Sequence, residues 1–218
     1  AGSAEAGSTI TVMDGATVLG TAVVAADGSW SVTPTTALAD GAHSITTRAT
    51  DAAGNVSPVS PALALTVDTA APAAPAAPTS TAPSTNDNTP GIHIGVGLTD
   101  TPSLYVDGVK VPATYDPVTG TLTPTTPLGD GVHQFTTTLT DAAGNESPQS
   151  AALPLTVDTA APAAPAAITG YADDIGRITN PNSTAPVTDD NRPGFNVGTG
   201  LTDTPSLYVD GVKVPATY

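Results

Sequence analysis

A long internal repeat constrains this chain more than any other feature of its sequence. Residues 37–77, ALADGAHSITTRATDAAGNVSPVSPALALTVDTAAPAAPAA, return in closely similar form at 127–167, so the two copies lie 90 positions apart (127 − 37). A second segment, GLTDTPSLYVDGVKVPATY, occurs at 97–115 and again at 200–218. Such self-similarity indicates that one structural unit is built several times along the chain.

Aligning the repeats predicts one whole unit between two partial ones. We expect a module lacking its first strand at 1–68, a Pro-rich linker at 69–86, a complete module at 87–158, a longer Asp-containing linker at 159–189, and the first half of a third module at 190–218. Pro-rich spacers favour extended and semi-rigid polyproline II structure. The predicted arrangement is therefore an extended rod of modules.

The local pattern within each unit is typical of short β-strands. In the first unit Ile10 and Val12 share one strand face, and Leu63, Leu65 and Val67 share another. Asp-Gly pairs punctuate these stretches, and Gly accepts the positive φ angle that tight turns require. Short alternating strands separated by regular turns predict an all-β fold of sandwich modules.

Composition excludes several partners. The 218 residues carry five Lys and Arg against 20 Asp and Glu, a formal net charge of −15. An acidic surface repels nucleic acid and anionic membrane faces, and no apolar run approaches the roughly 20 residues of a membrane helix. We therefore expect no nucleic acid and no membrane insertion in this segment. Cysteine is absent, so core packing, metal or both must hold the modules together.

A familiar family shares this ordered pattern. The stretches AEAGSTITVMDGATVLGTAVVAADGSWSVTPTTALADGAHSITTRATDAAGNVSPVS at 4–60 and TVDTAAPAAP at 66–75 resemble the bacterial immunoglobulin-like repeats of giant biofilm-associated adhesins, which Gram-negative bacteria export by type I secretion. The resemblance implies immunoglobulin-like sandwiches in an extracellular, cell-surface extender region, often rigidified by Ca²⁺ at module junctions. The second unit departs from the pattern, with Gly120 where the first has Trp30.

Acidic residues at the expected junctions are the candidate metal ligands. Strand parity places Asp68 near the pole of the second unit that carries Asp141 and Asn145, and we expect Asp87 and Asn88 at that same pole. Ca²⁺ takes six to eight oxygen ligands, commonly carboxylates and backbone carbonyls. The second junction is richer in acidic residues and offers Asp158, Asp173, Asp174, Asp189 and Asp190.

Other polar residues have structural interpretations. Asp at a loop end commonly caps its own turn, so for Asp51 and Asp141 turn capping and metal binding both remain open. His43 and His133 occupy equivalent strand positions, which favours a structural role, and Trp30 is interpreted as a core residue. The sequence contains no nucleophile elbow and no phosphate-binding loop. We therefore expect no enzymatic activity.

Three functions compete at this stage. The leading one is a structural spacer of a bacterial surface adhesin, which projects a distal binding domain and supports biofilm formation and cell adhesion. We expect its partners to be the neighbouring immunoglobulin-like modules of the same chain, with other copies of the chain as a further candidate. The second is a segment of a self-assembling extracellular filament, in which strands of one chain complete another. The third, an accessory binding module of a carbohydrate-active enzyme, is disfavoured by the scarcity of aromatic residues.

Overall fold

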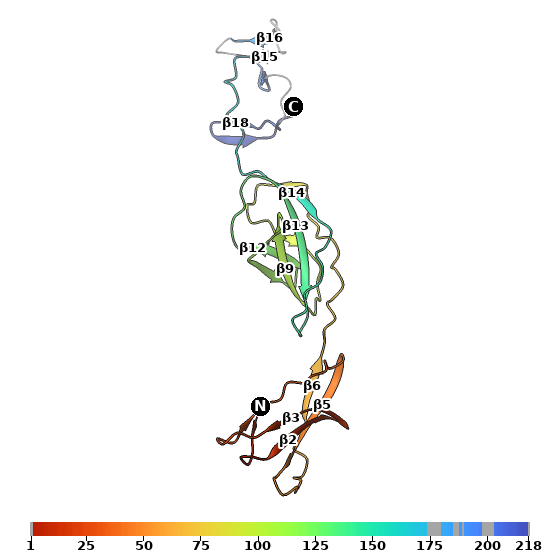
Figure 1. Cartoon of the computed structure of the whole chain (residues 1–218). Helices are drawn as coiled ribbons and strands as arrows, with labels where there is room; N and C mark the ends of the chain where they lie inside the picture. The colour runs from red at the N-terminus through yellow and green to blue at the C-terminus, as the bar shows by residue number, and fades with distance from the viewer. Residues whose placement is uncertain (1, 174–179, 185–187, 189, 198–202, 218) are drawn as a thin grey trace. The chain divides into compact units, whose positions relative to one another are not determined.

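The computed structural model describes all residues except 1, 174–179, 185–187, 189, 198–202 and 218 (Figure 1). The described residues form strands and loops, with no helix among them. The chain divides into two compact units, Ala1–Thr159 and Ala160–Tyr218. The predicted all-β fold is confirmed.

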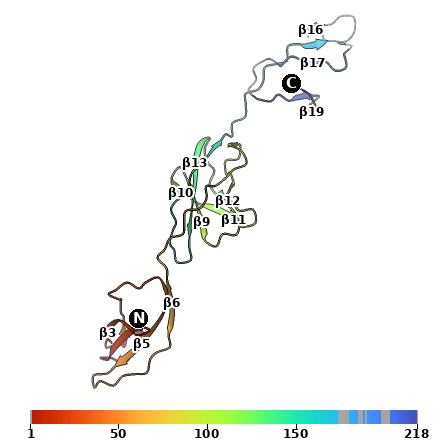
Figure 2. The ribbon, with the colours of Figure 1, turned by 90° about the vertical axis from the view of Figure 1, so that its right-hand side faces the viewer.

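Module 1 occupies the first part of the first unit. Its larger sheet has the strand order β3-β2-β5-β6, and β1 pairs with β4 in a small second sheet. Figures 1 and 2 show β3, β5 and β6 together in this module. Its strands are β1 (Gly2–Ser3), β2 (Thr9–Asp14), β3 (Thr17–Val23), β4 (Ser29–Trp30), β5 (Gly41–Thr50) and β6 (Leu63–Val67).

Module 2 has the same plan with more strands. A five-stranded sheet of order β10-β9-β13-β14-β7 faces a three-stranded sheet of order β11-β12-β8. Its strands are β7 (Ser84–Thr85), β8 (Ile92–His93), β9 (Thr101–Val106), β10 (Val109–Val111), β11 (Ala113–Asp116), β12 (Thr121–Pro124), β13 (Gly131–Thr140) and β14 (Leu153–Val157). The chain passes from β10 in one sheet to β11 in the other at Pro112, which has no N–H to leave unpaired.

The unit Ala160–Tyr218 contains two further small sheets. One has the order β16-β15-β17 and the other pairs β18 with β19. The strands are β15 (Tyr171–Asp173), β16 (Asn180–Ser183), β17 (Gly194–Phe195), β18 (Leu207–Val209) and β19 (Val212–Val214). The sequence that this unit shares with module 2 forms the same hairpin in both: β18 and β19 pair in the register of β9 and β10.

The Asp-Gly turn of this hairpin explains its register. Val106 pairs with Val109, so only Asp107 and Gly108 form the loop, and their φ angles are 52° and 80°. Two positive φ values are the signature of the type I′ turn, whose twist matches the flanking strands. Asp tolerates this region better than most residues and Gly does so freely.

The two modules differ in the size of their cores. In module 2, Ile92, Leu104, Val106, Leu122, Phe135 and Leu155 form one buried cluster between the sheets. In module 1 the buried cluster consists of Ile10, Val12 and Val24, with Trp30 packed against it. The expectation that Ile10 and Val12 share the inner face is confirmed, and so is the packing role of Trp30.

Two segments expected as linkers contain strands. Thr79 bridges to His93, and β7 lies parallel to β14 with Ser84 beside Thr156. Strands β15 and β16 lie within the second expected linker. The boundary of module 2 therefore moves from residue 87 towards its N-terminal side. Strand β7 has only two residues, so its sequence shows no alternation that would predict a strand. It lies at the edge of the sheet, where the neighbouring Pro83 is tolerated.

Candidate functional sites at the module poles

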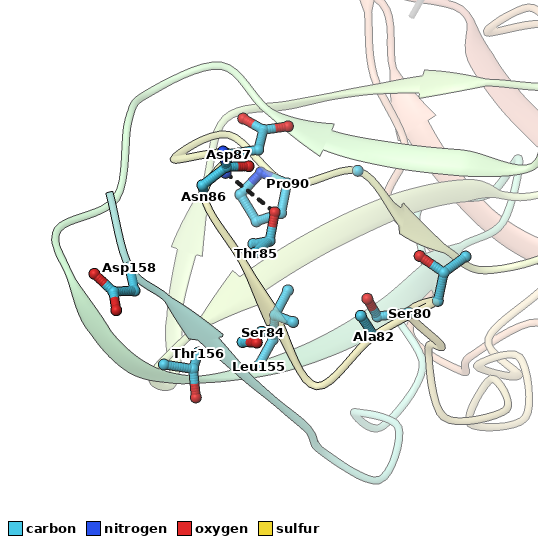
Figure 3. Close-up of a pocket in the computed structure, with 12 residues that line it drawn as sticks. Ser80, Ala82, Ser84, Thr85, Asn86, Asp87, Pro90, Leu155, Thr156 and Asp158 are labelled. Carbon is cyan, nitrogen blue, oxygen red and sulfur yellow. Dashed lines mark hydrogen bonds between the residues drawn. The ribbon is translucent and has the colours of Figure 1, made fainter. Parts of the chain in front are cut away.

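A polar pocket lies at the pole of module 2 where β14 ends (Figure 3). Its volume is about 570 Å³, and segment 80–91 and the end of β14 line it. Asp87 and Asp158 contribute carboxylates from these two elements, and the neighbouring Ser and Thr residues contribute hydroxyl groups. The lining therefore consists mainly of oxygen donors.

Asp87 shapes the turn that closes this pocket. Its Oδ1 accepts hydrogen bonds from the backbone N–H of Thr89 at 2.8 Å and from the Thr89 hydroxyl at 3.1 Å. The Asp87 N–H donates to Thr85 Oγ1 at 3.1 Å, and the Asn88 carbonyl accepts from the N–H of Leu128. The last of these bonds joins the segment to the loop that leads into β13.

The expected position of Asp87 and Asn88 is wrong. We expected them at the pole that carries Asp141, but β7 runs parallel to β14 and the Asp158 N–H donates to the Thr85 carbonyl at 2.9 Å. Since β13 and β14 are antiparallel, this end of β14 lies at the start of β13, whereas Asp141 follows its end. The chain before Asp87 runs parallel to β14, so Asp87 lies at the pole where β14 ends.

The TDAAGN loops close on their own aspartates in both modules. Asp141 Oδ1 accepts from the N–H groups of Ala143 and Asn145, both at 2.9 Å, and its Oδ2 accepts from the Asn145 side-chain amide at 3.0 Å. Asp51 and Asn55 repeat this arrangement. The Asn145 amide, followed by the Asn145 backbone N–H, lowers the pKa of Asp141. Asp141 thus caps its turn as a carboxylate.

Asn145 also contacts module 1. Its side-chain amide donates to the backbone carbonyl of Asp68 at 3.0 Å, while Asp68 Oδ1 accepts from the N–H of Ala70 at 3.1 Å. The prediction that Asp68 approaches the pole carrying Asp141 and Asn145 is confirmed. In module 1, Asn55 occupies the equivalent loop position.

The candidates of the second junction fall partly outside the described residues. Asp174 and Asp189 lie there, and Asp173 is described only as a β15 residue paired with Asn180. Asp190 is buried. Its Oδ1 accepts from the N–H of Arg192 at 2.7 Å, and its Oδ2 has no hydrogen-bond partner in the described part of the chain.

Two histidine–aspartate pairs were not foreseen from the sequence. His43 Nδ1 lies 2.6 Å from Asp14 Oδ2 and its Nε2 lies 2.8 Å from the Ala39 carbonyl. His133 repeats the pair with Asp107 at 2.8 Å and with the Gly129 carbonyl at 2.9 Å. The only available signal was that each partner Asp precedes a turn Gly.

Both histidine ring nitrogens face acceptors, so the doubly protonated ring fits the geometry best. The Asp107 carboxylate, and then the Gly129 carbonyl, raise the pKa of His133. Conversely, the backbone N–H of Gln134, and then His133, lower the pKa of Asp107. The pair ties the β9–β10 turn to β13, which is a structural task.

The polar atoms that line the pocket are mainly oxygens, which suit a hard cation better than a soft one. Oxygen ligands are those that Ca²⁺ prefers, and carbonyls and hydroxyls serve beside carboxylates. No group of three or more His, Asp or Glu side chains gathers around one point in the described ranges. A Ca²⁺ site at the pocket would therefore combine the carboxylates of Asp87 and Asp158 with neighbouring neutral oxygens.

Comparison with known proteins identifies the modules. The model of the bacterial Ig-like domain family matches residues 1–69 and 77–159, and the second match includes the segment that contains β7. A search of curated proteins finds no match. Among the described residues, no helix has the length and apolar character needed to cross a membrane.

A search of solved structures finds matches of low similarity, two of which are described next. The fibronectin(III)-like modules of Clostridium thermocellum CbhA are 15% identical, with a TM-score of 0.47, and the match covers 72% of this chain and 81% of theirs. SGBP-B of the Bacteroides ovatus mixed-linkage glucan utilization locus, solved with a mixed-linkage heptasaccharide, is 19% identical with a TM-score of 0.25. That match covers 72% of this chain and 46% of SGBP-B. Both scores are too low to support a functional argument.

Proposed function

The chain belongs to the family of bacterial Ig-like domains, and from this premise we propose that it is an extender segment of a bacterial cell-surface adhesin. It projects a distal binding domain from the cell and supports adhesion and biofilm formation. The protein acts outside the cell, and its task is mechanical and not catalytic. The single observation that carries this proposal is the match of two successive modules to one domain family.

The contact between the modules supports a spacer role. A spacer needs successive modules that meet through defined contacts, and the Asn145 amide supplies one by binding the Asp68 carbonyl at 3.0 Å. The histidines support a non-catalytic role, because both ring nitrogens of His43 and His133 are engaged by acceptors.

We also propose that Ca²⁺ binds at the acidic poles and stiffens the junctions. The net charge of −15 supports this proposal, since unneutralised carboxylates repel one another. Asp87 and Asp158 at the pocket of module 2 are the described residues best placed to hold the ion. The bound ion would neutralise the two carboxylates and connect the end of β14 to segment 80–91.

The extender role is tested in the bacterium that produces the protein. In-frame deletion of residues 77–159 should reduce adhesion to surfaces while the adhesin reaches the cell surface in unchanged amount. As a control, restoring residues 77–159 to the deletion strain should restore adhesion. Unchanged adhesion after the deletion contradicts the proposal. Inhibition of adhesion by the isolated chain also contradicts it, because that result would make these modules the binding domain.

Calcium binding is tested on the isolated chain by calorimetric titration and thermal unfolding. Ca²⁺ should raise the unfolding temperature of module 2, and Asp158→Asn together with Asp87→Asn should remove this response. Asp116→Asn is a control because Asp116, the last residue of β11, does not line the pocket; its carboxylate accepts hydrogen bonds from the Val118 N–H and the Thr119 hydroxyl. If Ca²⁺ changes neither stability nor the dimensions measured by small-angle scattering, the calcium proposal fails and the extender proposal remains.

A further inference from the structure

The outer face of the larger sheet differs in chemistry between the two modules. In module 1, Val12 of β2 lies in the core, so the next residue, Met13, points to the outer face of the sheet. The strand registers align this face with its counterpart in module 2, because Met13 pairs with Thr46 as Tyr105 pairs with Thr136. The two outer faces can therefore be compared position by position.

In module 2 the polar side chains of this face bind one another. Glu146 Oε1 accepts hydrogen bonds from the hydroxyl groups of Thr138 and Tyr105, at 2.5 and 2.9 Å. The same oxygen lies 3.3 Å from Lys110 Nζ, and Gln149 Oε1 accepts a hydrogen bond from a threonine hydroxyl of β13 at 2.8 Å. The polar groups of this face are thus satisfied within the module.

Module 1 carries apolar residues at the equivalent four positions. They are Met13, Val18, Val56 and Val59, in place of Tyr105, Lys110, Glu146 and Gln149. The side chains of Val18, Val56 and Val59 are 58%, 57% and 42% exposed. We call these four residues, together with Arg48 of β5, the valine face. Exposed apolar residues gathered on one face are typical of an interaction surface, whereas single ones are not.

Arg48 gives the valine face a positive charge. It lies two residues from Thr46, which pairs with Met13, and two residues from Thr50, which bridges to Val56. Arg48 is the only Lys or Arg of module 1, and within the described ranges it forms no salt bridge. No outward-facing position of β2 or β5 carries a carboxylate. Copies with a net charge of −15 repel one another, but this face does not contribute to the repulsion.

Pairing of two identical valine faces is disfavoured by this charge. It would place two Arg48 guanidinium groups in one interface without a carboxylate from either face, and a buried charge without a partner is costly. A complementary surface must therefore be apolar, carry a carboxylate and protrude far enough to reach a sheet face.

Module 2 carries such a surface at the tips of two neighbouring loops. Val118 in the β11–β12 turn is 85% exposed, and Val96 is 60% exposed. The loops are joined because the Ile94 N–H donates to the Gly120 carbonyl at 2.8 Å, and a Cβ at Gly120 would lie only 2.6 Å from the backbone of the neighbouring loop. The exposed carboxylate of Asp116 accepts from the Val118 N–H at 2.8 Å. We call Val96, Val118 and Asp116 the valine tip.

Module 1 has alanine where the valine tip has valine. The bond between the two loops is repeated there, from the Ala4 N–H to the Gly28 carbonyl, and it places Ala6 and Ala26 at the positions of the two tip valines. Module 1 thus carries the valine face without the tip, and module 2 carries the tip without the face. In the structure both surfaces are exposed, so the tip of one chain does not cover the face of the same chain.

We propose that the valine face of module 1 binds the valine tip of module 2 from a second copy of this chain. The two tip valines pack on the apolar residues of the face, and the Asp116 carboxylate of the second copy pairs with Arg48. The contact joins different surfaces of the two copies, so it is head-to-tail and extends into chains of copies when it does not close into a ring. Because few side chains take part, the association is weak. This assembly goes beyond the extender role.

Sedimentation of the full chain over a concentration series tests the proposal. Val56→Glu changes the face to the residue of module 2, and the double substitution Val96→Ala with Val118→Ala changes the tip to the residues of module 1. Each should weaken self-association at least about tenfold, the effect of about 1.4 kcal/mol on an equilibrium. The control Val109→Thr replaces an exposed valine outside both surfaces by the residue of module 1, and it should leave association unchanged. Fluorescence of the single tryptophan and the β13 amide signals verify that both modules are folded.

Mixing the two variants tests the head-to-tail geometry. At a concentration where neither variant self-associates, the intact tip of the Val56→Glu chain should bind the intact face of the double alanine chain in a one-to-one complex. Arg48→Glu should weaken self-association of the chain as Val56→Glu does. The proposal is overturned if the wild type stays monomeric throughout the series, if Val109→Thr weakens association equally, as general apolar adhesion predicts, if Arg48→Glu has no effect, or if the mixture does not associate, as pairing of identical faces predicts.

Discussion

Leu155 and Leu65 occupy equivalent positions in unequal environments, so replacing each by alanine should have unequal cost. Leu155 is 1% exposed within the module 2 cluster, and Leu65 is 43% exposed. Fully buried Leu→Ala changes cost about 2.7–5 kcal/mol, which includes the cavity left behind. Leu65→Ala removes three methyl or methylene groups that are a little over half buried. At about 0.8 kcal/mol per fully buried group, this should cost about 1.4 kcal/mol. No cavity cost is added, because solvent reaches the space that the side chain leaves.

The assay uses the single tryptophan of the chain. Trp30 packs in module 1, so its fluorescence follows denaturant unfolding of that module alone. Amide signals of β13 in heteronuclear NMR follow module 2. Leu155→Ala should leave the Trp30 transition unchanged and lower the stability of module 2 about two to three and a half times as much as Leu65→Ala lowers that of module 1. Equal costs would refute the interpretation that Leu65 is much less buried than Leu155.

Three further variants have defined outcomes. Asp107→Asn should lower the pKa of His133, measured by NMR titration, because Asp107 raises that pKa in the folded state. The protonated His133 therefore stabilises the fold fully below its unfolded pKa of about 6.5, and this contribution is lost as the pH rises through the folded pKa. The pH dependence of stability due to His133 should vanish in the variant. Asn145→Ala removes the bond to Asp68, so ¹⁵N relaxation should show modules 1 and 2 tumbling more independently. Asn55→Ala removes the equivalent bond within the loop of module 1, to Asp51, and should leave the tumbling unchanged. Equal effects of the two variants would contradict a stabilising contact between Asn145 and Asp68. Ser150→Ala should destabilise module 2 by about 1–3 kcal/mol in urea unfolding, because a buried backbone N–H loses its acceptor, and a change below about 0.5 kcal/mol would show that another acceptor replaces it.

The sequence predicts the elements that follow from short-range rules. Alternation located β2 and β6, and Asp-Gly pairs located the turns, because both signals depend on residues close in the chain. Strand parity also placed Asp68 beside the loop of Asn145, since that inference requires only the direction of β13 and β14. These features are governed by local geometry and by one antiparallel pair.

The failures concern contacts between distant residues of low-complexity sequence. The segment around β7 is rich in Pro, Ser and Thr and has no apolar alternation, so it read as a linker. It is held beside β14 by hydrogen bonds to two of its backbone carbonyls. Every residue has a backbone carbonyl, so the sequence carries no signal for this pairing. The wrong pole for Asp87 and Asn88 follows directly from that omission. The His133–Asp107 pair escaped notice because a turn Asp is expected to satisfy its own backbone.

The parallel pairing of β7 with β14 determines how module 2 meets a pulling force. Tension on the chain draws β7 back towards residue 83 and draws β14 forward towards Asp158, so the two strands are pulled in opposite directions along their shared axis. The bonds from Thr156 to Pro83 and from Asp158 to Thr85 are then loaded together in shear. They must break together, whereas the strands of an antiparallel hairpin pulled at its open end separate one bond at a time.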